Sequence, residues 1–307
     1  GAPTSPAAKG YAEEYNKSAN VITAGAWASG GALPTATSSS AAAGTQTAGL
    51  GFGGYAPSFS NATLKYDGSS WTAVNNMGTA RASLGGCGIQ TAALAFGGIT
   101  PPQTGKTEEY DGTNWSEQTD MTTARDRLGA AGIQTAALGF GGNTGPSGGP
   151  YPAATEEYDG SSWTNGGNLS SARRNIAGAG TQTAGLGFGG YAPPGNTNST
   201  EEYNGSSWTA GGNLLNAVAN LAGCGDSQTA ALKFGGSPSD RRPETEGYDG
   251  TTWSTRPSLA TGRQDLAGAG TNVAALAIGG FDGTNITNTE EFTGETTAAN
   301  IVDITTS

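Results

Sequence analysis

The chain has 307 residues, a formal net charge of −11 and no histidine. The absence of histidine excludes His-based catalytic triads, imidazole metal ligands and histidine acid–base catalysis. The acidic balance argues against nucleic acid and against insertion into or binding to an anionic membrane, and no apolar run reaches the roughly 18 residues of a membrane-spanning helix. The chain starts at Gly1 without a Met, so we expect a processed chain or a fragment.

Glycine is unusually frequent, with 53 residues, and 14 prolines add to it. Such a composition can indicate low-complexity disorder, but only 13% of the residues are charged, which is fewer than disordered chains usually carry. Hydrophobic residues make up 35% of the chain, so a core has to be assembled from many small contributions. The order of the residues shows how this is done.

A repeated unit runs through the whole chain. Its clearest marker is tryptophan, and all six tryptophans take part: Trp27, Trp71, Trp115, Trp163, Trp208 and Trp253. A leucine or methionine follows each tryptophan six residues later, an arginine follows ten residues later in four of the six units, and a glycine pair ends the unit's second apolar segment. Six units in one register indicate a repeat architecture.

Each unit contains four expected strands, which we label a to d in chain order. In the second unit we expect strand a at 81–86, strand b at 90–96, strand c at 108–110 and strand d at 115–118. An Asp-Gly or Asn-Gly pair separates strand c from strand d, and this is a strong hairpin signal because the turn requires positive φ. No segment shows the extended 3.6-residue apolar period of a helix.

The distribution of small and bulky residues suggests how these sheets pack. Strand a is rich in glycine and alanine, which suits a crowded centre, whereas tryptophan and tyrosine lie on strands c and d, where radially packed sheets diverge. Radial packing also buries both faces of every sheet and protects the sheet edges. We therefore predict an all-β fold, a six-bladed β-propeller of four-stranded antiparallel blades, with seven blades as the alternative.

We predict that a single propeller spans residues 1–307. Five blades are continuous in the sequence, at about 37–76, 81–120, 125–168, 173–213 and 218–258. The sixth, at 263–293, lacks a tryptophan strand, and we expect the strand around Trp27 to complete it from the other end of the chain. Residues 12–16 and 297–307 would then be surplus strands. In the alternative arrangement the C-terminal tail takes that position, and residues 11–30 form an extra hairpin or part of a seventh blade.

The order of motifs in the unit resembles a known repeat. Gly-Gly after strand b, Tyr-Asp after strand c, Trp in strand d and Arg ten residues later is similar to the kelch pattern, over about residues 11–305. The resemblance implies a kelch-type β-propeller. The chain departs from the pattern at Thr37 and Val218, where the arginine is missing, and at Ile278, which replaces phenylalanine.

A closer resemblance lies in the amino-acid sequence of the repeat units. The segments TEEYDGSSWTNGGNL (155–169) and AGAGTQTAGLGFGG (177–190) are similar to kelch-like virion proteins of marine cyanobacterial phages. This resemblance implies a phage structural protein on the virion surface, as a capsid decoration or as part of a tail or fibre. It also implies other virion proteins as partners, in a homo-oligomer or multi-copy assembly.

The loops between strands b and c are the best candidates for binding. Alternating strands place them on one rim together with the d–a connections, and they differ in length and composition from blade to blade, whereas the a–b and c–d turns are nearly uniform. Variable loops on a rigid scaffold commonly carry function. The candidate binding residues are Tyr55, Pro102, Tyr151, Tyr191, Arg241, Arg242 and Phe281. In the alternative interpretation the aromatic side chains pack on the next blade and the two arginines are merely solvated.

The residues that recur in every unit are expected to be structural. The six tryptophans should pack between blades, and the repeated arginines (Arg81, Arg125, Arg173 and Arg263) should bridge to glutamates of strand c such as Glu108, Glu109, Glu156 or Glu157. Adjacent glutamates of one strand point to opposite faces, so they do not form a catalytic dyad or a bidentate metal site. The aspartates Asp67, Asp111, Asp159 and Asp249 should form turns, and no EF-hand-like spacing is present.

Cys87 and Cys224 occupy the same repeat position three blades apart. In a six-bladed ring they lie on opposite inner strands, and we expect two free, buried thiols. Neither a catalytic group, nor a metal site, nor a cofactor is predicted.

Three functions remain as hypotheses. The first is a non-enzymatic virion component that presents the b–c loops to a neighbouring subunit or a host-surface glycan. The second is a free carbohydrate-binding lectin, and the third is an enzyme acting on glycosides. An enzyme of the third kind needs two carboxylates facing one another across a cleft, and the spacing of acidic residues gives no support for that.

Overall fold

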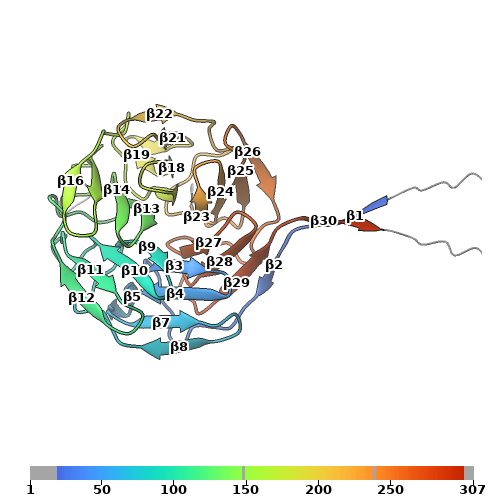
Figure 1. Cartoon of the computed structure of the whole chain (residues 1–307), viewed down its shortest axis with the longest axis horizontal. Coiled ribbons are helices and arrows are strands. Elements are labelled where there is room, and N and C mark those ends of the chain that lie inside the picture. Colours follow the sequence, from blue (N-terminus) through green and yellow to red (C-terminus); the bar gives the residue numbers. More distant parts are fainter. Residues whose placement is uncertain (1–18, 147–148, 238–239, 301–307) are drawn as a thin grey trace, which may run out of the picture. The chain divides into compact units, whose positions relative to one another are not determined.

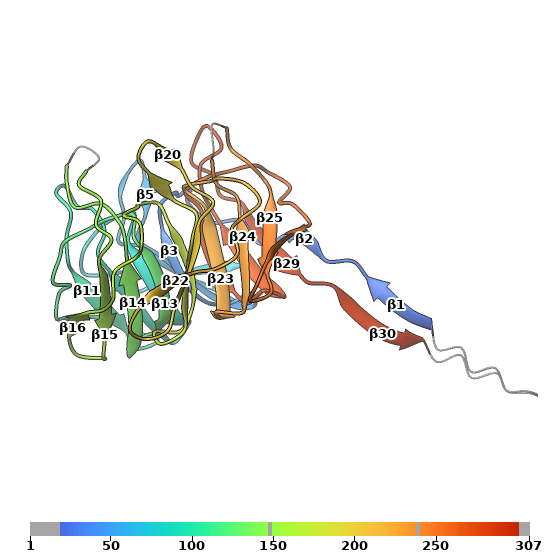
Figure 2. The same cartoon turned by 90° about the horizontal axis from the view of Figure 1, so that it is seen from above.

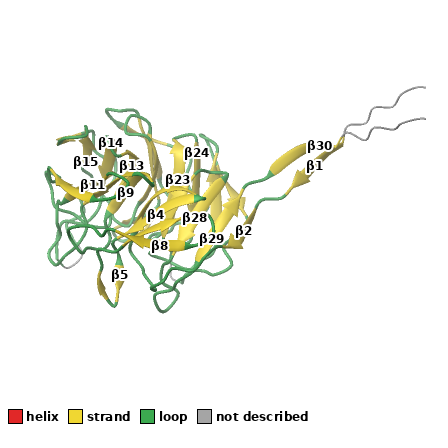
Figure 3. Cartoon of the chain, turned by 60° about the horizontal axis from the view of Figure 1, so that its bottom comes forward, coloured by secondary structure: helices red, strands yellow, loops and turns green. Residues whose placement is uncertain are grey.

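The computed structural model describes residues 19–146, 149–237 and 240–300. It divides into two units, of which the larger is Gly25–Gly294 and the smaller comprises Gly1–Ala24 and Glu295–Ser307. Within the described ranges the secondary structure consists of strands and turns without helices (Figure 3).

The larger unit is a ring of six four-stranded antiparallel sheets, which confirms the predicted six-bladed β-propeller (Figure 1). Seen from the side, the strands run roughly along the axis of this ring (Figure 2). The first three blades are β3 (Ala41–Thr45), β4 (Ala48–Phe52), β7 (Thr63–Tyr66) and β8 (Trp71–Val74); β9 (Gly85–Ile89), β10 (Ala92–Phe96), β11 (Thr107–Tyr110) and β12 (Trp115–Gln118); and β13 (Gly129–Ile133), β14 (Ala136–Phe140), β15 (Thr155–Tyr158) and β16 (Trp163–Asn165).

The other three blades repeat this order. They are β17 (Ala177–Gly180), β18 (Gly185–Phe188), β21 (Thr200–Tyr203) and β22 (Trp208–Ala210); β23 (Ala222–Ser227), β24 (Ala230–Phe234), β25 (Thr245–Tyr248) and β26 (Trp253–Arg256); and β27 (Ala267–Gly270), β28 (Ala274–Ile278), β29 (Thr289–Thr293) and β2 (Ala26–Ser29). Two small hairpins lie in b–c loops, β5 (Tyr55–Ala56) with β6 (Ser58–Phe59) and β19 (Tyr191–Ala192) with β20 (Gly195–Asn196).

The sixth blade joins the two ends of the ring. Its outermost strand is β2, which pairs antiparallel with β29, and Trp27 stands opposite Phe292. This is the position that the sequence indicated for the Trp27 strand. The innermost strands contact one another in chain order, and β27 contacts β3, so the ring is closed.

The smaller unit contains one described element, a two-stranded antiparallel ribbon. In it β1 (Ala19–Thr23) pairs with β30 (Thr296–Asn300), with Ala19 opposite Asn300. The described part of the C-terminal tail is therefore a strand outside the blades. Residues 12–16 and 301–307, for which we expected surplus strands, lie outside the described residues.

The inner strands begin later than the sequence analysis predicted. Strand a of the second blade was expected at 81–86, but β9 covers Gly85–Ile89, and strand b starts at Ala92 rather than at Gln90. The reason is backbone geometry near the axis: Ser83 has a φ of 53°, in the left-handed region that a strand cannot contain. The segment from Arg81 to Leu84 is therefore a loop that leads into the strand.

The tryptophans join neighbouring blades, as predicted. Each indole Nε1 donates a hydrogen bond of 2.9–3.0 Å to the hydroxyl of the threonine that starts strand c of the preceding blade: Trp27 to Thr245, Trp71 to Thr289, Trp115 to Thr63, Trp163 to Thr107, Trp208 to Thr155 and Trp253 to Thr200. In five blades the indole also contacts a phenylalanine of the preceding blade, as Trp115 does with Phe52. In the sixth blade, Ile278 takes the position of this phenylalanine.

The paired glutamates of strand c serve two different partners. The first glutamate accepts from the buried arginine of its own blade, as in Arg81–Glu108 at 3.1 Å and Arg125–Glu156 at 2.8 Å. The second accepts from a tyrosine hydroxyl of the next blade, as Glu109 does from Tyr158 at 3.0 Å. Desolvation and the bond to that glutamate raise the pKa of Tyr158 above its ordinary value. The pairing predicted for the first glutamates is confirmed, whereas Glu109 and Glu157 do not pair with arginine.

Cys87 and Cys224 are free and buried on β9 and β23, as predicted. Burial raises the pKa of both thiols.

Candidate functional site

The two rims of the propeller differ in chemistry. One rim carries the a–b and c–d turns, and the other, which we call the variable rim, carries the d–a loops and the b–c loops 55–62, 99–106, 143–154, 191–199, 237–244 and 281–288 (Figure 2). Short antiparallel bridges connect each d–a loop to the following b–c loop, for example Ala82 with Ile99 and Arg174 with Tyr191. The loops of the variable rim are therefore anchored to the scaffold at their bases.

The c–d turns on the opposite rim are held by the aspartates that we predicted to form turns. Asp67 Oδ1 accepts the backbone N–H groups of Ser69 and Ser70 at 2.9 and 2.8 Å, and these bonds together with the Ser69 hydroxyl lower the pKa of Asp67 to about 2. Asp159 is held in the same way. These carboxylates are occupied by their own turns.

A ring of six residues surrounds the axis on the variable rim. Each stands twelve residues after a tryptophan and has a φ between 53° and 56°, in the left-handed region: Ser39, Ser83, Arg127, Asn175, Asn220 and Asp265. Asparagine and aspartate tolerate this conformation better than other non-glycine residues. We call these six residues the axial ring.

Backbone hydrogen bonds join the axial ring around the axis. Five of its residues donate their N–H to the carbonyl of the ring member in the preceding blade, at 2.7–2.9 Å, and the bond from Ser39 to Asp265 connects the first blade to the last. These bonds hold the strained backbone in the same conformation in every blade. The side chains are thereby free to differ while the scaffold stays constant.

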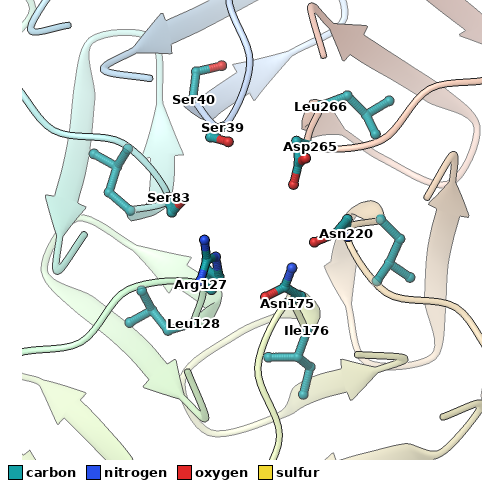
Figure 4. Close-up of a pocket in the computed structure, with 12 residues that line it drawn as sticks. Ser39, Ser40, Ser83, Arg127, Leu128, Asn175, Ile176, Asn220, Asp265 and Leu266 are labelled. Atoms are coloured by element: carbon teal, nitrogen blue, oxygen red, sulfur yellow. The ribbon is translucent and has the colours of Figure 1, made fainter. Parts of the chain in front are cut away.

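The axial ring lines a cavity of about 100 Å³, together with the residue that follows each member in sequence. Figure 4 shows the polar side chains of Arg127, Asn175, Asn220 and Asp265 directed toward the axis. The Oδ1 atom of Asn175 is buried and has no hydrogen-bond partner in the described part of the chain. The cavity can therefore offer both donors and acceptors to a polar ligand.

Two opposite charges face each other across this cavity. Arg127 and Asp265 belong to blades three steps apart in the ring, and Arg127 keeps 40% of its side chain exposed. Its Nε atom lies 3.7 Å from Asp126, which is itself fully buried. Desolvation raises the pKa of Asp265, while a hydrogen bond from Gln264 and the charge of Arg127 act in the opposite direction. The cavity thus has an anionic side and a cationic side.

The aromatic candidates of the b–c loops do not form one site. Tyr151 and Tyr191 lie together, with ring centroids 6.0 Å apart, and the guanidinium of Arg174 stacks on both rings at 4.9 and 5.3 Å. On another part of the rim Arg241 stacks on Phe281 at 4.9 Å. These contacts favour the alternative interpretation for these aromatic residues, which is packing across loops.

The remaining candidates are dispersed. Arg242 makes ion pairs with Asp240 and Glu244, at 3.0 and 3.5 Å. Pro102 is exposed, and Tyr55 is 42% exposed. The backbone carbonyl of Tyr55 accepts a hydrogen bond from the side chain of Asn285, in the b–c loop of the sixth blade. Tyr55, Pro102 and Arg241 are the predicted rim residues that are exposed, and the ring of Tyr55 packs edge-on against Phe59 at 5.7 Å.

The sequence analysis missed the axial ring. Its members differ in identity, so they are invisible to a search for repeated residues, but their spacing from tryptophan is constant and they are enriched in Asn, Asp and Ser. That combination was the available signal.

No protein-family model matches the chain, and no curated protein matches it in sequence. Among the described residues, no helix is long and apolar enough to cross a membrane. A search of the same residues finds no group of three or more Cys, Asp or Glu placed to hold a metal ion.

Proposed function

We propose that the chain is a kelch-type propeller that serves as a non-enzymatic structural protein on the surface of a phage virion and presents its variable rim to a partner. The resemblance of the repeat units to kelch-like phage virion proteins supports the virion setting. One structural observation carries the binding role: six backbones with the same conformation around the axis hold six side chains that are not all alike. A scaffold that repeats its fold but varies one face is suited to recognition.

The opposite rim is suited to attachment. Ile89 and Ile133 end β9 and β13 at this rim, Val273 lies in an a–b turn, and each of the three is more than half exposed. Exposed apolar side chains on one face favour contact with another protein. We propose that this rim faces a neighbouring virion protein or a second copy of the chain, and that the variable rim faces outward.

A carbohydrate-binding role is the second candidate, and the axial ring favours it. Serine, asparagine, aspartate and arginine side chains around one cavity provide the donors and acceptors that sugar hydroxyls require. Tyr55, exposed on the same rim, offers an aromatic face. The two candidate functions are compatible, because a virion protein can bind a glycan on the host surface.

The proposal is tested by locating the chain and by probing its two rims separately. Cryo-electron microscopy of the assembled particle shows whether the chain is a surface component with the variable rim outward, and a glycan array on the isolated chain tests sugar binding. A variant with Arg127→Gly, Asn175→Gly and Asn220→Gly removes axial side chains while glycine keeps the positive φ. We expect it to lose ligand binding but to assemble normally.

A matched variant of the other rim, Ile89→Ser with Ile133→Ser, should retain ligand binding and lose assembly. Absence of the chain from the particle would contradict the virion role. Ligand binding that survives in the axial variant would contradict the axial site.

A further inference from the structure

Each of the six blades has a position for a buried cation, and this position is filled in five of them. In the second blade Arg81 Nη1 donates to the carbonyls of Gly97 and Lys106, and its Nη2 donates to the carbonyl of Ala95 and to Glu108. Arg125, Arg173 and Arg263 repeat this arrangement with Glu156, Glu201 and Glu290. In the fifth blade Lys233 supplies the cation opposite Glu246.

The first blade lacks both members of the pair. Thr37 stands where the arginine belongs, and Leu64 stands where the glutamate belongs. Each arginine is fully buried and each glutamate is at most 3% exposed in the other blades, whereas Thr37 and Leu64 are only half-buried. The pair has been replaced by shorter, neutral side chains that leave space around them.

That space is a cavity of about 110 Å³, which we call the Thr37 cavity. Its walls include the apolar side chains of Leu33, Phe52, Leu64 and Ile278, and no ionisable side chain lines it. Hydroxyl side chains also line it: Thr35, Thr37, Ser40 and Ser60. A cavity of this size with mainly apolar walls can hold a small molecule.

Three further wall residues are the counterparts of the guanidinium's acceptors. Gly51, Gly53 and Ala62 line the cavity, and they hold the repeat positions of Ala95, Gly97 and Lys106, whose carbonyls accept from Arg81. The hydroxyl of Thr37 is directed to the carbonyl of Thr35 at 3.0 Å and does not replace the guanidinium there. The cavity therefore combines apolar walls with carbonyl acceptors.

We propose that the Thr37 cavity binds a small uncharged molecule with an apolar body and a hydrogen-bond-donating head, of the alcohol or primary amide class. A cation is disfavoured because no carboxylate lies in the cavity to compensate its desolvation, and an anion is disfavoured because no cationic side chain lines it. Of the residues that line this cavity only Ser40 also lines the axial cavity, and the inference does not depend on the proposed function.

The probe for this site is 2-propanol, titrated into the whole chain with labelled leucine and isoleucine methyl groups and followed by NMR. We expect saturable shifts at Leu33, Leu64 and Ile278 and none at Leu138, a fully buried leucine of the third blade. Shifts that rise linearly with concentration, or that are equal at Leu138, would overturn the proposal. Guanidinium and acetate at the same concentrations should give no saturable shift, and saturation by either would overturn the uncharged class.

The control restores the pair found in the other blades. In Thr37→Arg with Leu64→Glu, the guanidinium fills the cavity, and we expect the saturable shifts at Leu33 and Ile278 to be lost. If this variant does not fold, Leu64→Phe fills the same space with an apolar ring and should give the same loss. Unchanged 2-propanol shifts in whichever variant folds would show that the probe binds elsewhere and would overturn the assignment.

Discussion

The ammonium of Lys233 lies 3.7 Å from the carboxylate of Glu246 in the place that a guanidinium holds in four other blades. Its Nζ also donates to the carbonyl of Glu244 at 3.3 Å, the counterpart of the Lys106 carbonyl that accepts from Arg81. Lys233 comes from strand b, whereas the arginines come from the d–a loop, where Val218 now stands. The same cation site is thus reached from a different strand, and desolvation lowers the pKa of Lys233.

Lys233→Ala should destabilise the propeller by about 3–5 kcal/mol, because Glu246 is left buried without its cation. Alanine itself fits this position, since Ala95 occupies it in the second blade. The measurement is the free energy of unfolding in urea. Adding Val218→Arg to Lys233→Ala rebuilds the arrangement of the other blades and should recover at least half of the loss. A double variant no more stable than Lys233→Ala would contradict this account.

Tyr110→Phe and Tyr158→Phe should have different effects although they change the same repeat position. The Tyr158 hydroxyl donates to Glu109, whereas the buried Tyr110 hydroxyl has no partner among the described residues, because Lys65 replaces the glutamate and lies over the ring at 5.5 Å. We expect Tyr158→Phe to cost about 1.5–3 kcal/mol and Tyr110→Phe to be neutral or stabilising. Equal losses in thermal or urea unfolding would refute the assigned partners.

Trp115→Ala should destabilise the propeller by about 3–5 kcal/mol, as expected for truncation of a large packed aromatic side chain. It removes both the ring contact with Phe52 and the bond from Nε1 to Thr63. Thr63→Val removes only the bond and should cost about 1 kcal/mol. Urea unfolding of both variants separates the two contributions, and an unchanged midpoint for Trp115→Ala would exclude a structural role.

Asp265→Asn should stabilise the chain at neutral pH but not in strong acid. Desolvation raises the pKa of Asp265 in the folded state above its ordinary value of 3.8. The contribution of Asp265 to folding stability is therefore fully present below pH 3.8, and it is lost as the pH rises through the folded-state pKa. Asparagine does not titrate and fits the left-handed backbone, as Asn175 and Asn220 do. The difference in unfolding free energy between variant and parent should grow as the pH rises from 3 to 7.

Asp67→Asn is the matched contrast, with the opposite sign. The pKa of Asp67 is lowered to about 2 by its turn, so its contribution is present above 3.8 and is lost as the pH falls toward 2. Asn204 holds the same turn position in the fourth blade and accepts the same kind of bonds. The parent should exceed this variant in stability at neutral pH, and the two should converge in acid. The same pH trend in both variants would contradict the assigned shifts.

The register of tryptophan, tyrosine and glycine was sufficient to predict six blades, the place of Trp27 and the burial of Cys87 and Cys224. These features depend on residue types that recur at the same position in each unit. A residue type that recurs in this way occupies the same structural environment in each blade. The start of strand a could not be predicted in this way. Its glycine-rich segment is compatible with strand or loop, and the left-handed turn at Ser83 is imposed by hydrogen bonds to the neighbouring blades.

The candidate site was predicted only in part. The rim that carries the variable loops followed from strand alternation and loop variability, but the contacts that occupy Arg241 and Arg242 depend on how separate loops fold against one another. The Thr37 cavity was also missed, because the loss of arginine at Thr37 has meaning only beside the loss of glutamate at Leu64. These two residues are distant in sequence and meet through the packing of the blade.

The strand that completes the sixth blade has a consequence for the order of folding. β2 reaches its partner β29 only when the chain has been made almost to the end of the ring, so Trp27 has no blade to join until then. Such a distant pairing forms slowly because the intervening loop must close first. Five blades can assemble in succession during synthesis, and closing the circle is the last step. A circular permutant with new ends in another c–d turn would transfer that late step to a different blade.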